Sequence, residues 1–188
     1  MEIPAQLILL SIPSLIYMLA RAPRPILVDL GWTSSKNIYF LQGIGMALVT
    51  GVLMIFVMRM IPEGVLDNPM VSTSIYAAWS PSILSFIYAW VREAFYITLG
   101  EEVFFRGLLG GWLERRFGFR VGNAVQAVVF ILPHLLLLMI STSFWLVIIV
   151  QFIAGWVLGW LRSSSGSILP GWVAHSLINA IGALSSML

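Results

Sequence analysis

The chain has 188 residues, of which 60% are hydrophobic and only 10% are charged. Its mean hydropathy is +0.97, and its charged fraction is well below the ~25% of soluble domains, so the composition indicates an integral membrane protein and excludes an ordinary soluble fold. The net charge of +2 is small and no cysteine is present; we therefore expect no nucleic-acid partner, and disulfides, thiolate nucleophiles, Cys-ligated metals and prenylation of this chain are excluded.

Several apolar stretches approach or exceed the ~20 residues that cross a bilayer as a helix. In chain order they cover residues 4–20, 37–61, 80–117, 121–140, 144–161 and 168–187. The N-terminus lacks the basic region of a signal peptide, so we expect the first stretch to be a retained span. Ser80 and Pro81 are typical of a helix start, which predicts one long helix from there to Phe117. The pattern predicts an all-α, polytopic membrane helix bundle.

The charges of the loops predict the topology. The basic residues Arg21, Arg24, Lys36, Arg115, Arg116, Arg120 and Arg162 fall in the first, third and fifth loops, and the acidic residues Glu63 and Asp67 fall in the second. With six spans every basic loop lies on one side, as the positive-inside rule expects, and both termini lie outside. A seventh span, with a break near residues 92–93, would put the basic third loop on the other side. We expect one integral-membrane domain over residues 1–188 with about six spans.

Two adjacent glutamates, Glu101 and Glu102, lie inside a hydrophobic helix. A charge at the bilayer centre costs about 2.5–3.5 kcal/mol on insertion scales, so such residues indicate a function. Glu102 and Arg106 are four residues apart on one helix face, which predicts an ion pair. Glu101 has no such partner in its own helix, so it is the better candidate for a general base. The alternative is that Glu101 accepts a hydrogen bond from a polar group on another helix.

The chain's two histidines also lie in predicted spans. His134 is in the fourth, and His175 shares a face of the sixth with Asn179, four residues later. At 1.5 Å of rise per residue, Glu101 and His134 lie at similar depth, so these side chains could line one polar cavity. The alternatives are a satisfied core histidine and, for Asn179, a hydrogen bond between helices.

Three ordered motifs then suggest a family. They are Glu101-Glu102-x-x-x-Arg106, Phe130-x-x-x-His134 and His175-x-x-x-Asn179. They resemble the motifs of the CAAX protease and bacteriocin-processing (CPBP) family of intramembrane endopeptidases, which includes CAAX prenyl protease 2. The resemblance covers about residues 83–184, where we expect the protease-like core. The first third of the chain carries no motif, and the chain is short for a eukaryotic member, so we expect the cell membrane of a prokaryote.

The resemblance implies hydrolysis of a peptide bond within the membrane. It implies that Glu101 activates a water near His134, that the Glu102–Arg106 pair organises the site, and that His175 and Asn179 stabilise the oxyanion. The implied partners are the bilayer and a peptide or protein with a membrane-embedded or lipidated segment. A prenylated C-terminal tetrapeptide, a leader peptide and a membrane-protein segment are all compatible with the sequence.

The cofactor and the class of protein have alternatives. No His-Glu-x-x-His is present, and we expect a metal-free glutamate mechanism because the two extra polar groups suit stabilisation of the oxyanion. The alternative is a zinc ion held by Glu101, His134 and His175 together with a water. Intramembrane Glu, His and Arg also build proton relays, so a proton-coupled transporter is a second class. A non-catalytic membrane scaffold or immunity protein on the same fold is a third.

Overall fold

The structure, a computed structural model, describes residues 5–21 and 26–188, and within these ranges every regular element is helical. The α-helices are α1 (Ala5–Arg21), α2 (Ile26–Asp29), α3 (Asn37–Met58), α4 (Ile83–Arg92), α5 (Leu99–Glu101), α6 (Gly111–Ile131), α7 (Leu137–Ile140), α8 (Trp145–Ser165) and α9 (Leu169–Met187). Two π-helical segments, η2 (Glu93–Thr98) and η3 (Glu102–Gly110), and three 3₁₀ turns, η1 (Ser74–Tyr76), η4 (Pro133–Leu136) and η5 (Thr142–Phe144), complete the elements. Pro4, the expected start of the first span, and Arg24 lie outside the described residues.

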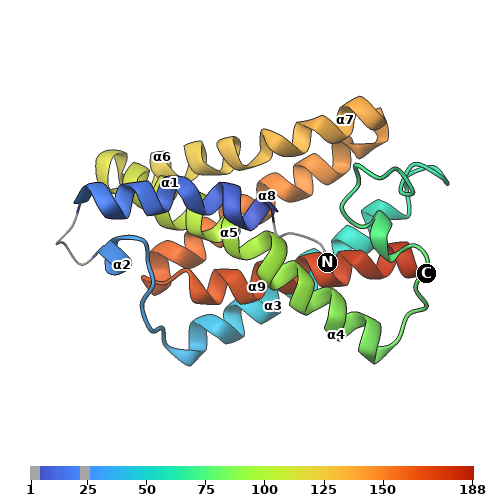
Figure 1. Ribbon diagram of the computed structural model, residues 1–188, viewed down its shortest axis with the longest axis horizontal. Helices are drawn as coiled ribbons and strands as arrows, with labels where there is room; N and C mark the ends of the chain where they lie inside the picture. The colour runs from blue at the N-terminus through green and yellow to red at the C-terminus, as the bar shows by residue number, and fades with distance from the viewer. Residues whose placement is uncertain (1–4, 22–25) are drawn as a thin grey trace.

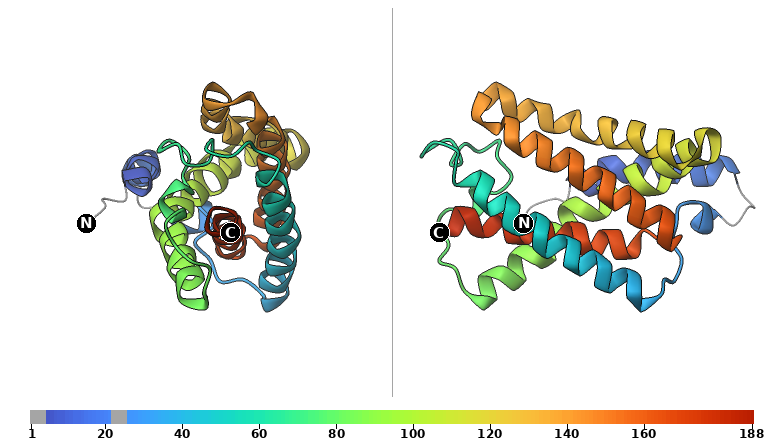
Figure 2. Two further views of the ribbon diagram at one scale, coloured as in Figure 1. Left: turned by 90° about the vertical axis from the view of Figure 1, so that its right-hand side faces the viewer. Right: turned by 180° about the vertical axis from the view of Figure 1, so that it is seen from behind.

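Helix α9 is the centre of the bundle. Figure 2 shows it end-on with α3 and α4 on either side and α1 at one edge. Small residues let α3 approach it closely, as in other membrane bundles: a Cβ added to Gly51 would lie 2.8 Å from Ile181. Ala47 of α3 and Ala174 of α9 are fully buried in one apolar cluster. This packing fixes the helix that carries His175 and Asn179.

The two predicted glutamates lie on one continuous helical stretch, α4–η2–α5–η3, which runs on into α6 (Figure 1). The expected start at Ser80 and Pro81 is wrong, because the cap is Ser82: its Oγ accepts the backbone N–H of Ser85, and Ser85 Oγ accepts the N–H of Ser82. The stretch is not a uniform α-helix, since the two π-helical segments flank α5. Such segments are rare and often occur at functional sites.

Two breaks divide the following helices. Gly118 has φ of 77° and ψ of 165°, a backbone that favours glycine, and the chain reverses there, between the predicted third and fourth spans. The predicted continuous span 121–140 is interrupted, because Pro133 has no N–H to continue the helix. Helix α6 therefore ends at Ile131, and the chain passes through the 3₁₀ turn η4 into the short α7. His134 lies in that turn.

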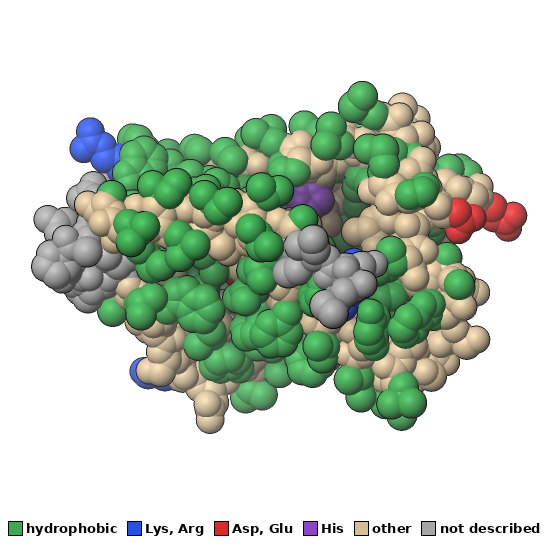
Figure 3. Space-filling view, viewed as in Figure 1, with side chains coloured by type: hydrophobic (Ala, Val, Ile, Leu, Met, Phe, Trp, Pro, Cys, Tyr) green, Lys and Arg blue, Asp and Glu red, His purple; other side chains and the backbone are tan. Residues whose placement is uncertain are grey.

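The surface is that of a protein embedded in lipid. By length and composition, three helical stretches of the described chain can cross a membrane: Asn37–Met58, Ile83–Ile140 and Thr142–Ser165; α1 is a shorter apolar helix. Apolar side chains cover much of the face in Figure 3, where acidic side chains project at one end and basic side chains project at the other, with a further basic group near the middle. Such an apolar surface suits a bilayer rather than water. The apolar helix bundle is confirmed, and the count of six spans stays a prediction.

Candidate active site

The predicted ion pair is present. Arg106 Nη1 lies 3.2 Å from Glu102 Oε1, and both side chains are fully buried. The Arg106 guanidinium also lies over the ring of Phe130, with Cζ 4.1 Å from its centroid. Each charge has therefore lost its water, and the opposite charge and the aromatic face replace part of that solvation.

His175 connects the two glutamates. Its Nδ1 lies 2.9 Å from Glu102 Oε1, and its Nε2 lies 3.5 Å from Glu101 Oε2. An ionised carboxylate only accepts hydrogen bonds, so Nδ1 carries the proton of that bond. His175 is 2% exposed, and its imidazole contacts a glutamate on each side. Four predicted residues, Glu101, Glu102, Arg106 and His175, are thus brought into one contiguous cluster.

Glu101 has a partner that the motifs did not predict. The side-chain amide of Gln6, on α1, donates a hydrogen bond to Glu101 Oε1. Helix α1 reaches this position because Gly100 has no side chain: a Cβ there would lie 2.8 Å from the Cα of Leu7. The first third of the chain therefore contributes to the site. The contact is compatible with both interpretations of Glu101, a general base and an interhelical acceptor.

His134 approaches the cluster from another side. Its Nδ1 lies 3.0 Å from the carbonyl oxygen of Phe130, to which it donates. In the neutral ring Nε2 is then free of a proton and can accept one. The ring of Phe130 contacts both imidazoles, with its centroid 5.0 Å from that of His134 and 5.7 Å from that of His175. His134 interacts electrostatically with Glu101 and is partly exposed, and Figure 3 shows a histidine side chain at the surface.

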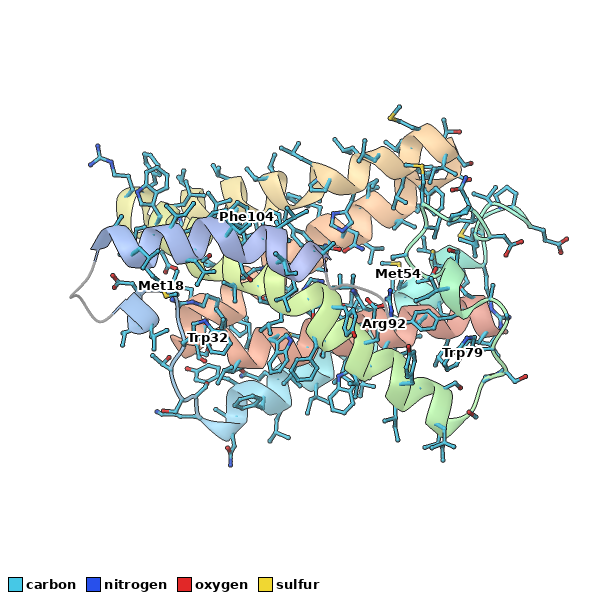
Figure 4. The ribbon with its side chains drawn as sticks, in the orientation of Figure 1. Met18, Trp32, Met54, Trp79, Arg92 and Phe104 are labelled. Atoms are coloured by element: carbon cyan, nitrogen blue, oxygen red, sulfur yellow. The ribbon has the colours of Figure 1, made fainter. Side chains whose placement is uncertain are left out.

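Asn179 contacts a third glutamate that the sequence analysis did not single out. Its Nδ2 donates to Glu93 Oε2 at 3.2 Å, while Glu93 Oε1 accepts from Tyr76 Oη at 2.9 Å and from Arg92 Nη1 at 3.2 Å. Figure 4 labels Arg92 near the middle of the molecule, where α4 meets η2. The sequence itself marks Glu93 as a candidate site residue, because it is a carboxylate in an apolar helix.

Tyr76 stays protonated and so remains a hydrogen-bond donor to Glu93. Its ring is fully buried, although it lies in the loop between α3 and α4. Burial and the neighbouring Glu93 carboxylate hold the pKa of Tyr76 well above its usual range. The hydroxyl therefore keeps its proton and donates it to Glu93 at physiological pH.

The residues of the zinc alternative do not form a ligand set. In residues 5–21 and 26–188, no three His, Cys, Asp or Glu side chains converge closely enough to hold a metal ion. The Nδ1 contacts of His175 with Glu102 and of His134 with the Phe130 carbonyl do not bear on this point, because a metal-bound histidine commonly makes such a bond with its other ring nitrogen. A zinc site needs three protein ligands around one point, which this arrangement does not supply.

Apolar helices around buried carboxylates, an arginine and an imidazole define an integral membrane protein with a polar site among its helices. The chain belongs to the Rce1-like family of type II CAAX prenyl endopeptidases, whose family model matches residues 82–181, more than half of the chain. All six predicted site residues fall within the matched region. Neither a curated protein nor a solved structure matches the chain. Membership in the family places the protein among intramembrane CAAX proteases in general.

Proposed function

We propose that this protein is a metal-independent intramembrane endopeptidase in which Glu101 activates the attacking water. The observation that carries the proposal is the contact of His175 with both glutamates. It puts a carboxylate that can take a proton beside an imidazole that can donate one. Amide hydrolysis needs both a base and donors for the oxyanion.

The proposed reaction begins with a water between Glu101 and the substrate. As the water oxygen bonds to the peptide carbonyl carbon, Glu101 takes one of its protons. His134 Nε2 accepts a hydrogen bond from the same water and orients it. The carbonyl oxygen becomes an oxyanion, which the Asn179 amide and His175 stabilise; His175 acts here as an imidazolium, with one proton on Nδ1 bonded to Glu102 and the other on Nε2. The C–N bond then breaks, and the proton on Glu101 passes to the leaving nitrogen.

The Glu102–Arg106 pair supports this chemistry without touching the reacting atoms. Glu102 accepts from His175 Nδ1 and so orients the ring toward Glu101. Arg106 balances the charge of Glu102 in surroundings where an unpaired carboxylate is costly. Both residues are positioning residues in this proposal.

For the substrate, we propose a peptide or protein whose scissile bond follows a lipidated or membrane-embedded segment. The description of the family as prenyl endopeptidases supports a prenylated C-terminal peptide. The apolar surface supports it too, because a lipid chain can approach such a site through the bilayer. We propose the cell membrane of a prokaryote as the location.

Cleavage of a farnesylated peptide that ends in a CAAX sequence tests the proposal. The purified protein is placed in liposomes, and the released tripeptide is measured by mass spectrometry. We expect Glu101→Gln to lower turnover by about 10²–10⁴-fold, because an amide cannot act as the base. Glu63→Gln, the same change at an exposed loop residue, is the matched control and keeps full activity. Equal turnover by wild type and Glu101→Gln contradicts the role of Glu101 as the base, whereas absence of cleavage by the wild type returns the chain to the scaffold or transporter alternatives.

A further inference from the structure

The second polar cluster, made of Glu93, Asn179, Tyr76 and Arg92, lies next to the proposed catalytic residues. Glu93 precedes Glu101 by eight residues on the same continuous helical stretch, and Asn179 follows His175 by one turn of α9. The contacts Glu101–His175 and Glu93–Asn179 are therefore successive layers between two antiparallel helical stretches. The carboxylates of Glu93 and Glu101 are close enough to interact electrostatically.

The carboxylate of Glu93 determines which end of the Asn179 amide faces it. An ionised carboxylate only accepts hydrogen bonds, whereas an amide has a donating nitrogen and an accepting oxygen. The nitrogen therefore turns to Glu93, as the 3.2 Å contact shows. A rotated amide would bring its oxygen against the carboxylate, and two acceptors would repel each other. One N–H of Asn179 is used by Glu93, and the second N–H stays available.

Glu93 itself is held firmly. Tyr76 and Arg92 donate to Oε1, and Asn179 donates to Oε2. Each carboxyl oxygen therefore accepts at least one hydrogen bond, and Arg92 also brings a positive charge to Oε1. Glu93 is 3% exposed, so water competes little for these bonds. The orientation of Glu93 is thus fixed by α9, by its own helix and by the loop that carries Tyr76.

We propose that Glu93 is a positioning residue that locks the Asn179 amide with an N–H donor directed to the oxyanion. The inference rests on the proposed function, in which Asn179 stabilises that oxyanion. Without the lock, the amide would also populate the rotated state, in which its oxygen replaces the donor. Tyr76, in the loop between α3 and α4, helps to hold Glu93 in this orientation by donating a hydrogen bond to its Oε1.

A double-mutant cycle tests this role. The kcat and KM for the farnesylated peptide are measured for wild type, Glu93→Gln, Asn179→Ala and the double variant. We expect Asn179→Ala to lower kcat by about 10²–10³-fold. Glu93→Gln keeps the shape but can donate as well as accept; we expect kcat to fall about 10-fold or more with KM unchanged, since a positioned donor acts in the transition state. The double variant is expected to be no slower than Asn179→Ala, because residues that act through one group are not additive.

Tyr76→Phe keeps the carboxylate and removes one of its donors, so it repeats the test if Glu93→Gln does not fold. Its smaller loss of kcat is also expected to vanish in the Asn179→Ala background. Additive losses in either cycle, or a change confined to KM, would overturn the positioning role while leaving the protease intact. Absence of cleavage by the wild-type protein would instead overturn the proposed function, and this inference with it.

Discussion

His175 donates a hydrogen bond from Nδ1 to Glu102 Oε1 across 2.9 Å, and this bond links α9 to η3 inside the bundle. Glu102 is also the partner of Arg106, so one carboxylate oxygen joins a cation and an imidazole. Removing any of the three leaves a buried polar group without its partner, which costs more than the pair itself contributes. The site and the stability of the bundle therefore depend on the same atoms.

The first prediction concerns the buried ion pair. Arg106→Ala is expected to lower the free energy of unfolding by about 3–5 kcal/mol, because it leaves the Glu102 carboxylate without its cation. The double variant Glu102→Gln with Arg106→Gln removes both charges and is expected to recover part of the stability but not the turnover. Thermal unfolding in detergent measures both variants. Arg116→Ala, on an exposed arginine of the same helical hairpin, is the control, and wild-type stability of Arg106→Ala would contradict the pairing.

The sequence predicted contacts within one helix better than contacts between helices. The Glu102–Arg106 pair follows from the four-residue spacing alone, and the break at Gly118 lies between two predicted spans. The bonds from His175 to Glu102 and from Gln6 to Glu101 join segments 73 and 95 residues apart. Their formation depends on how α1 and α9 pack, which no local pattern records.

Two features of the site, Glu93 and the helix break beside His134, can be recognised in the sequence. Glu93 meets the same criterion as Glu101, an ionisable residue in an apolar helix, but it was considered only as the location of a break. Pro133 predicts an interrupted helix beside His134, and the span was nevertheless expected to continue to residue 140. The π-helical segments around α5 had no such signal, since they arise from packing of the whole stretch.

The second prediction concerns the packing of α3 on α9. Gly51→Ala is expected to destabilise the protein by about 1–3 kcal/mol, because the new Cβ would lie 2.8 Å from Ile181 in a packed interface. Gly45→Ala on the same helix is the matched control. Nothing lies within 4 Å of a Cβ there, so alanine is expected to be neutral or to stabilise the helix by up to about 1 kcal/mol. Equal thermal unfolding temperatures in detergent would contradict the close approach.

The third prediction is the orientation in the membrane. We expect a cysteine at position 116, in the basic third loop, to react only from the cytoplasmic side, and a cysteine at position 63 to react only from the outside. Both native residues are exposed, and the chain has no cysteine of its own, so each single variant reports one position. Labelling with a membrane-impermeant maleimide in oriented vesicles gives the measurement. Reaction of both positions from the same side would contradict the six-span topology.

The last prediction separates a glutamate mechanism from a zinc mechanism. We expect cleavage of the farnesylated peptide to persist after prolonged treatment with a chelator, and elemental analysis to find no stoichiometric zinc in the active preparation. The physical reason is the arrangement of the candidate ligands: among the described residues no three His, Cys, Asp or Glu side chains converge on one point, and His175 Nε2 faces the Glu101 carboxylate. Activity that is lost on chelation and restored by zinc would contradict the prediction. In that case Glu101, His134 and His175 would have to rotate toward one point, and substitution of any of them would abolish zinc binding as well as cleavage.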